Sequence, residues 1–132
     1  MYILMYMMVD SFANVYSNLN QLYMAGIMTI PMIIIELFLM RSMYNNKMLN
    51  SLITISSSAI FILLIVFLRK QIEITDKEFL KSMIPHHGAA ILMCKSNKLI
   101  KDPEIKKLCE NIGSTQQSEI DFMKAKLASI QK

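Results

Sequence analysis

The stretch LITISSSAIFILLIVFL, residues 52–68, decides the class of fold, because none of its 17 residues carries a charge. A helix needs about 20 apolar residues to cross the hydrocarbon core of a bilayer, and about 17 is the lower limit. A second stretch, LYMAGIMTIPMIIIELFLM at residues 22–40, has 19 residues and one ionisable group, Glu36. The short polar connection between the two stretches predicts a transmembrane helical hairpin, in which Pro31 kinks the first helix.

The first nine residues, MYILMYMMV, are apolar but too short to span a bilayer. They lack the basic flank and the cleavage site of a signal peptide, so they indicate an interfacial segment or the end of a truncated third span. Charge leaves the orientation open. Arg41 and Lys47 favour a cytoplasmic hairpin loop, whereas the four basic residues between Arg69 and Lys81 favour the reverse.

The charged residues are concentrated after the second stretch. Of the 14 basic residues, 12 lie from Arg69 onward together with 8 of the 10 acidic residues, so this part carries the whole net charge of +4. A basic module beside a membrane can touch anionic head groups, but the lysines alternate with acids, which favours an ordinary solvated surface. No basic block with interleaved aromatic residues is present, and we expect no nucleic-acid partner.

Helix-start signals follow residue 70. Thr75 with Glu78 three residues later forms a capping box, and Asp102 followed by Pro103 is typical of an N-cap and a first helical position. These signals predict two helices, at about 76–99, bent or broken at Pro85, and at about 103–131.

The expected fold is therefore all-α, with a membrane anchor at residues 1–70 and a helical module at residues 71–132. A module of this size buries only a marginal core. We expect two such hairpins to associate in a four-helix arrangement, so that the protein is a homodimer or a higher homo-oligomer.

The predicted helix KSMIPHHGAAILMCKS, residues 81–96, collects soft metal ligands. On an ideal helix Met83, His86, His87 and Met93 share an arc of about 120°. An antiparallel partner helix with a turn near residue 101 pairs residues whose numbers sum to about 203, which brings Met123, with Glu119 beside it, to the Pro85 end. Thioethers and imidazoles favour Cu(I) over magnesium or calcium. Methionines also fill helix–helix cores, so these residues alone support a metal site and a packed core equally.

The same register places Cys94 opposite Cys109. The two residues are a disulfide, an added thiolate pair for Cu(I), or two small buried hydrophobic residues. The sequence leaves these three interpretations open.

Two patterns resemble one known family. The first is D-x-x-F-L-x-x-M-I-P-H-H-x-x-A-I-x-M at residues 76–93, and the second is DPEIKKLCENI followed by QQSEIDFM at residues 102–123. Over about residues 72–130 they resemble the family catalogued as domain of unknown function number three hundred and five. The resemblance implies a small ferritin-like helical domain, linked to copper binding and copper resistance, on the anchor of a membrane-bound subgroup. It implies candidate copper ligands at Met83, His86, His87, Met93 and Met123.

The function expected from this resemblance is a membrane-anchored copper-binding protein that sequesters Cu(I), or hands it on to a delivery partner, in copper tolerance. Its module is expected in the periplasm, at the outer face of a bacterial inner membrane. The alternative is a membrane-bound helical interaction or structural protein whose His pair is structural or senses pH. No nucleophile–base pattern is visible, and the Glu-x-x-His pairs of a di-iron centre are absent from the sequence, so we expect no enzyme activity.

Methionines also recur in the first apolar stretch. Met24, Met28, Met32 and Met40 lie at four-residue spacing, and Glu36 occupies the missing position. An ionisable group in a span suggests a functional site, and such a row could pass a soft cation. Ordinary packing of methionine is the favoured interpretation.

Overall fold

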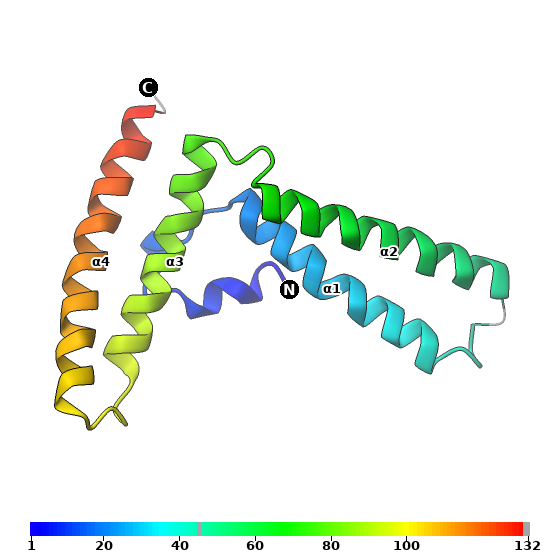
Figure 1. Ribbon diagram of the computed structural model, residues 1–132, viewed down its shortest axis with the longest axis horizontal. Helices are drawn as coiled ribbons and strands as arrows, with labels where there is room; N and C mark the ends of the chain where they lie inside the picture. Colours follow the sequence, from blue (N-terminus) through cyan, green and yellow to red (C-terminus); the bar gives the residue numbers. More distant parts are fainter. Residues whose placement is uncertain (45, 131–132) are drawn as a thin grey trace. The chain divides into compact units, whose positions relative to one another are not determined.

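The computed structural model describes residues 1–44 and 46–130, and the regular secondary structure among these residues is helical, with no strand (Figure 1). This confirms the all-α class. Contacts divide the chain into two compact units, which we call the apolar unit (Met1–Tyr2 and Asn20–Glu73) and the α3–α4 unit (Ile3–Leu19 and Ile74–Lys132). The division into an anchor at 1–70 and a module at 71–132 stays a prediction. The packing adds residues 3–19 to the C-terminal helices.

The apolar unit contains α1, Leu19–Leu39, and α2, Lys47–Lys70. These helices correspond to the two predicted spans, and both are long and apolar enough to cross a membrane. The α1 helix continues through Pro31. The α2 helix ends in a Schellman-type cap, in which Gln71 is left-handed and the Ile72 N–H donates to the Phe67 carbonyl at 3.0 Å.

The first half of α1 packs against the second half of α2. A Cβ added to Gly26 would lie 2.6 Å from Leu64 Cδ1, so the glycine permits a close approach. Tyr23 packs edge-on against Phe67 with ring centroids 5.9 Å apart, and its hydroxyl donates to the Ile72 carbonyl at 3.1 Å. Side-chain contacts between the start of α1 and the end of α2 therefore hold the hairpin together.

The methionine row on α1 does not enter this packing. Met24, Met28, Met32 and Glu36 are all exposed. In a bilayer these side chains would meet lipid or another protein chain, and the idea of cation conduction stays a prediction.

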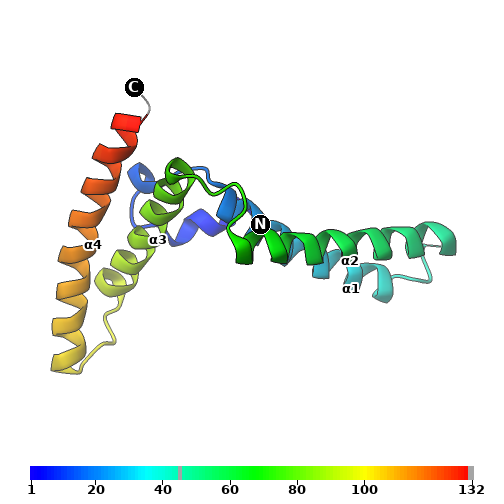
Figure 2. The ribbon, with the colours of Figure 1, turned by 45° about the horizontal axis from the view of Figure 1, so that its top comes forward.

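The α3–α4 unit is an antiparallel helical hairpin, formed by α3, Asp76–Ser96, and α4, Pro103–Ile130 (Figures 1 and 2). Both predicted N-caps are confirmed: Thr75 Oγ1 accepts from the Glu78 N–H at 3.4 Å, and Asp102 Oδ1 accepts from the Glu104 N–H at 2.8 Å. The sequence predicted that this helix would be bent or broken at Pro85. The prediction of a break is wrong, because α3 runs through Pro85 as one helix.

The core of this unit lies between the two helices. The spacing of its members puts three side chains on one face of α3 and three on one face of α4, and Tyr16 and Met83 pack against their edge. These core residues are Leu80, Ile84 and Ile91 on α3, and Ile120, Met123 and Leu127 on α4.

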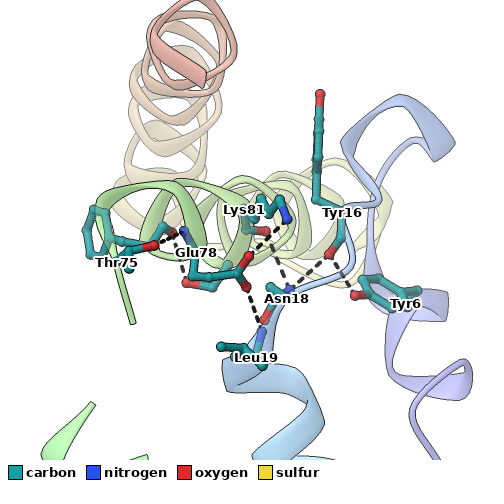
Figure 3. A network of polar contacts seen from close by, with 9 residues as sticks. Tyr6, Tyr16, Asn18, Leu19, Thr75, Glu78 and Lys81 are labelled. Carbon is teal, nitrogen blue, oxygen red and sulfur yellow. Dashed lines mark hydrogen bonds and ion pairs between the residues drawn. The ribbon is translucent and has the colours of Figure 1, made fainter. Parts of the chain in front are cut away.

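The N-terminal segment, with the 3-10 helices η1 (Leu4–Met8) and η2 (Phe12–Asn14), packs on α3. Pro85 has no N–H and therefore leaves the Lys81 carbonyl without its helical donor. The Asn18 amide donates to this carbonyl at 3.4 Å, and Glu78 Oε2 accepts from the Leu19 N–H at 3.0 Å (Figure 3). The proline thus creates an acceptor that the segment before α1 uses for docking.

Gly88 is the point of closest approach between this segment and α3. A Cβ at Gly88 would lie 2.5 Å from Asp10 Oδ1 and 3.1 Å from Val9 Cγ1, and Asp10 is held by a 2.7 Å hydrogen bond from Asn14. Alanine would gain about 1 kcal/mol of helix propensity but would force the segment outward, which costs about 1–3 kcal/mol.

We expect Gly88→Ala to lower the free energy of unfolding by about 1 kcal/mol, as the difference between these two terms. The matched control is Gly113→Ala on α4, where an added Cβ meets nothing within 4 Å; this change should raise stability by about 0.4–1 kcal/mol. Urea unfolding of the detergent-solubilised chain, followed by circular dichroism, measures both. Equal effects of the two changes would contradict the docking of the N-terminal segment at Gly88.

Candidate metal site

His87 occupies the centre of the candidate site. Its side chain is 12% exposed, and its Nδ1 atom lies 3.0 Å from Glu119 Oε2 on α4. The same Nδ1 is fully buried and has no hydrogen-bond partner among the described residues, so the close contact lacks the alignment of a hydrogen bond. We treat the pair as ionic, formed when the imidazole is protonated. In the neutral tautomer with the proton on Nε2, Nδ1 offers a buried lone pair.

Burial lowers the pKa of His87, the carboxylate of Glu119 raises it, and the neighbouring His86 lowers it, with a net decrease from the usual value of 6.5. The imidazole is therefore neutral at pH 7. Neutral imidazole is the form that binds a metal ion.

Two thioethers flank this pair along the helices. Met83 precedes His87 by one turn of α3 and packs against the core, and Met123 follows Glu119 by one turn of α4 and is 7% exposed. Gln116 Oε1, on the same helix as Glu119, is another buried atom without a hydrogen-bond partner among the described residues. The hairpin therefore brings His87, Met83, Met123 and Glu119 into one region.

The other two predicted ligands lie toward solvent. His86 is exposed, with its ring centroid 6.0 Å from that of His87, and the side chain of Met93 is 63% exposed. These two residues are seven positions apart and share one face of α3, about 100° from the face of His87. The predicted arc of about 120° that holds the four α3 ligands is wider than the face of α3 that α4 covers. Only Met83 and His87 therefore lie on the side of α3 that faces α4.

The cysteines form a disulfide between Cys94 and Cys109, whose Cα atoms are 5.1 Å apart. The disulfide interpretation is confirmed, and so is the predicted register at this pair. Both thiolates are then unavailable to a metal ion. Within residues 1–44 and 46–130, no three His, Cys, Asp or Glu side chains form a metal-binding group, so a metal site here depends on the thioethers.

The residues that sequence reasoning missed are those that dock the N-terminal segment, above all Asn18 and Asn14. Both are buried. Pro85 was the available signal, because a proline inside a helix leaves a carbonyl four residues earlier that needs another donor. The distance in sequence between Asn18 and Lys81 gave no indication that they would meet.

Acidification is expected to weaken the α3–α4 unit through His87. Because its pKa is lower in the folded chain than the unfolded value of 6.5, the unfolded chain binds more protons in the range below 6.5. The stabilisation that comes from neutral, buried His87 is therefore complete above pH 6.5. It is lost as the pH falls toward the pKa of the folded chain, by at most about 1.4 kcal/mol per pH unit for one group. The urea midpoint at pH 8 and pH 5.5 measures this loss.

His87→Gln should remove most of this pH dependence, and the matched change His86→Gln should keep it. The lowered pKa of Glu78 acts in a separate range. Burial raises the pKa of Glu78. The hydrogen bonds from Lys81 and Leu19 and the charges of Lys81 and Lys77 together lower it by more, so that the net pKa lies below its usual value of 4.5. Its stabilisation is lost only as the pH falls below that value. An unchanged midpoint between pH 8 and 5.5 would contradict the burial of His87.

Two comparisons relate the chain to known proteins. The family model described as "Domain of unknown function (DUF305)" matches residues 38–129. The chain is similar to "Uncharacterized protein L153" of Acanthamoeba polyphaga mimivirus, with 38% identity over 116 residues that cover 86% of this chain and 74% of that protein. No solved structure matches it. The chain therefore belongs to the DUF305 family.

Proposed function

We propose that this protein is a membrane-anchored copper-binding protein that sequesters Cu(I), or hands it on, in copper tolerance. One observation carries the proposal. His87 presents a buried nitrogen that has no hydrogen-bond partner among the described residues. Met83 lies one turn from His87 on α3, and Met123 lies one turn from Glu119, the residue that His87 contacts, on α4.

The donor set fits a soft monovalent ion. A neutral imidazole and two thioethers are ligands that favour Cu(I) over hard ions such as magnesium. Thioethers lose no proton on binding, and the low pKa of His87 keeps the imidazole deprotonated, so the ion would face little competition from protons at neutral pH. Within this proposal His87, Met83 and Met123 hold the ion, and the exposed His86 and Met93 are candidates for its first capture from solvent.

The proposed location is the oxidising side of a membrane. Two helices long and apolar enough to cross a bilayer support the anchor, and disulfides such as Cys94–Cys109 persist in the periplasm, outside cells and on virion surfaces. A bacterial inner membrane with a periplasmic module stays a prediction. The mimiviral relative is a viral protein, so it gives no support to a bacterial location.

The proposed partners are a second copy of this chain and a copper-delivery protein, and the proposed activity is binding without catalysis. The α3–α4 unit has six buried core side chains, while Phe79 and Phe122 are 50% and 69% exposed. Association of two hairpins would cover such side chains.

The ion pair of His87 with Glu119 favours a second candidate function. A protonated His87 would form an ion pair with this carboxylate at 3.0 Å. Because burial makes that protonation unfavourable in the folded chain, the strength of the contact between α3 and α4 would change with pH. In that case the protein is a helical interaction protein whose His pair is structural or senses pH.

A Cu(I) competition titration of the detergent-solubilised full chain against a chromogenic chelator separates the two candidates. We expect His87→Ala, Met83→Leu and Met123→Leu each to weaken Cu(I) affinity by about tenfold or more. Met48→Leu is the matched control, because Met48 is 85% exposed at the start of α2, and should leave affinity unchanged. Unchanged affinity in His87→Ala, with normal helicity, would favour the interaction protein.

A further inference from the structure

The tip of the α3–α4 hairpin, residues 92–110, is the yellow region of Figure 1. It carries two neighbouring hollows, and the Cys94–Cys109 disulfide lines both of them. One has a volume of about 880 Å³ and is lined by Lys95, Lys98 and Lys106. The other has a volume of about 670 Å³ and a mainly apolar lining. The three residues proposed to hold copper, His87, Met83 and Met123, line neither hollow, whereas Met93 lines the second.

The lysines of the first hollow have no carboxylate within ion-pair distance in the part of the chain that the structure describes. Glu110 also lines this hollow, so the lining has three cationic side chains and one anionic side chain. Asp102 is already engaged as a helix cap, where its Oδ1 accepts two backbone N–H bonds. The tip therefore offers positive charge that its own acids do not neutralise.

The second hollow is lined by apolar side chains that the core leaves outside. Leu99 is 84% exposed and Met93 is 63% exposed, and Leu92 and Ile100 complete the apolar part of the lining. Ile105 and Leu108, on the first turns of α4, are 48% and 55% exposed. Exposed apolar side chains that lie together mark interaction sites more often than isolated ones do.

We propose that this tip docks on the anionic head groups of a lipid bilayer. The lysines match phosphate groups in charge, and Leu99 with Met93 matches the boundary between head groups and acyl chains, as in other interfacial anchors. A solvated lysine surface would explain the first hollow alone. The apolar hollow beside it, across the same disulfide, favours a partner that is both anionic and apolar. The proposal does not depend on the copper site at His87, Met83 and Met123.

A tryptophan reporter tests the proposal, because the chain contains no tryptophan. The full chain with Leu99→Trp is reconstituted in vesicles of phosphatidylcholine, with or without phosphatidylglycerol, and quenched with lipids brominated in their acyl chains. We expect blue-shifted emission and strong quenching in the anionic vesicles only. High salt should reverse both effects, because exposed charges are screened.

Two controls make the test specific. Lys95→Gln, Lys98→Gln and Lys106→Gln together should abolish the quenching, whereas Lys124→Gln with Lys126→Gln, away from the tip on α4, should not. Phe122→Trp, a 69% exposed position outside the tip, should stay unquenched. Water-exposed emission of Leu99→Trp in both kinds of vesicle would overturn the proposal, and so would equal quenching in both.

Discussion

Replacing Ile120 with alanine is expected to destabilise the α3–α4 unit by about 2–5 kcal/mol, the usual cost of such a cavity in a core. Ile120 is fully buried and packs within a cluster of only six buried side chains. A core this small supplies a few kcal/mol of net stability, so the change should unfold a large fraction of the molecules. Urea unfolding followed by circular dichroism gives the difference in free energy.

The matched control is Ile105→Ala on the same helix. Ile105 is 48% exposed, and its replacement should change stability by less than about 0.5 kcal/mol, as surface substitutions usually do. Equal losses at positions 120 and 105 would mean that the face of α4 that carries Ile120 does not form the core.

Reduction of the Cys94–Cys109 disulfide is expected to lower the free energy of unfolding by about 3 kcal/mol. The disulfide closes a short loop, because its cysteines are 15 positions apart in the sequence, and a loop of about this length restricts the unfolded chain by about 3 kcal/mol in the chain-entropy account. Thermal unfolding with and without dithiothreitol measures the change. It should appear as a lower midpoint temperature.

The double variant Cys94→Ser with Cys109→Ser should unfold at the midpoint of the reduced chain and should not respond to dithiothreitol. A variant that is as stable as the oxidised chain would contradict the cross-link. Cu(I) affinity of the folded variant is expected to stay within about threefold, because His87 lies almost two turns of α3 before Cys94.

Features that follow from local chemistry could be predicted from the sequence. The N-caps at Thr75 and Asp102 depend on side chains and backbone groups within three residues, and both are present. The position of Cys94 opposite Cys109 follows from a short turn and the helical period, whereas the sequence left open whether the two residues form a disulfide. The two apolar helices follow from their length and the lack of charge.

Features that depend on distant contacts could not be predicted. The docking of residues 3–19 on α3 rests on hydrogen bonds such as that from Asn18 to Lys81, which are separated by 63 positions. The division of the predicted ligands into buried His87 and exposed Met93 depends on how much of α3 is covered by α4, and helical periodicity does not give that width.

The pattern M-I-P-H-H at residues 83–87 therefore combines packing with chemistry. Ile84 is a fully buried core residue, and Pro85 frees the carbonyl that docks the N-terminal segment. Met83 contacts the core, and His87 holds the unpartnered nitrogen. His86 is exposed and has neither a core position nor a helix-packing role.

The most direct test of the proposed copper site is X-ray absorption spectroscopy of the full chain loaded with one equivalent of Cu(I). We expect sulfur scatterers from Met83 and Met123 together with a nitrogen scatterer from His87. The sulfur signal should fall in Met83→Leu and Met123→Leu, and the imidazole signal should disappear in His87→Ala. A spectrum with only nitrogen and oxygen ligands, or one that His87→Ala leaves unchanged, would contradict the proposed copper site.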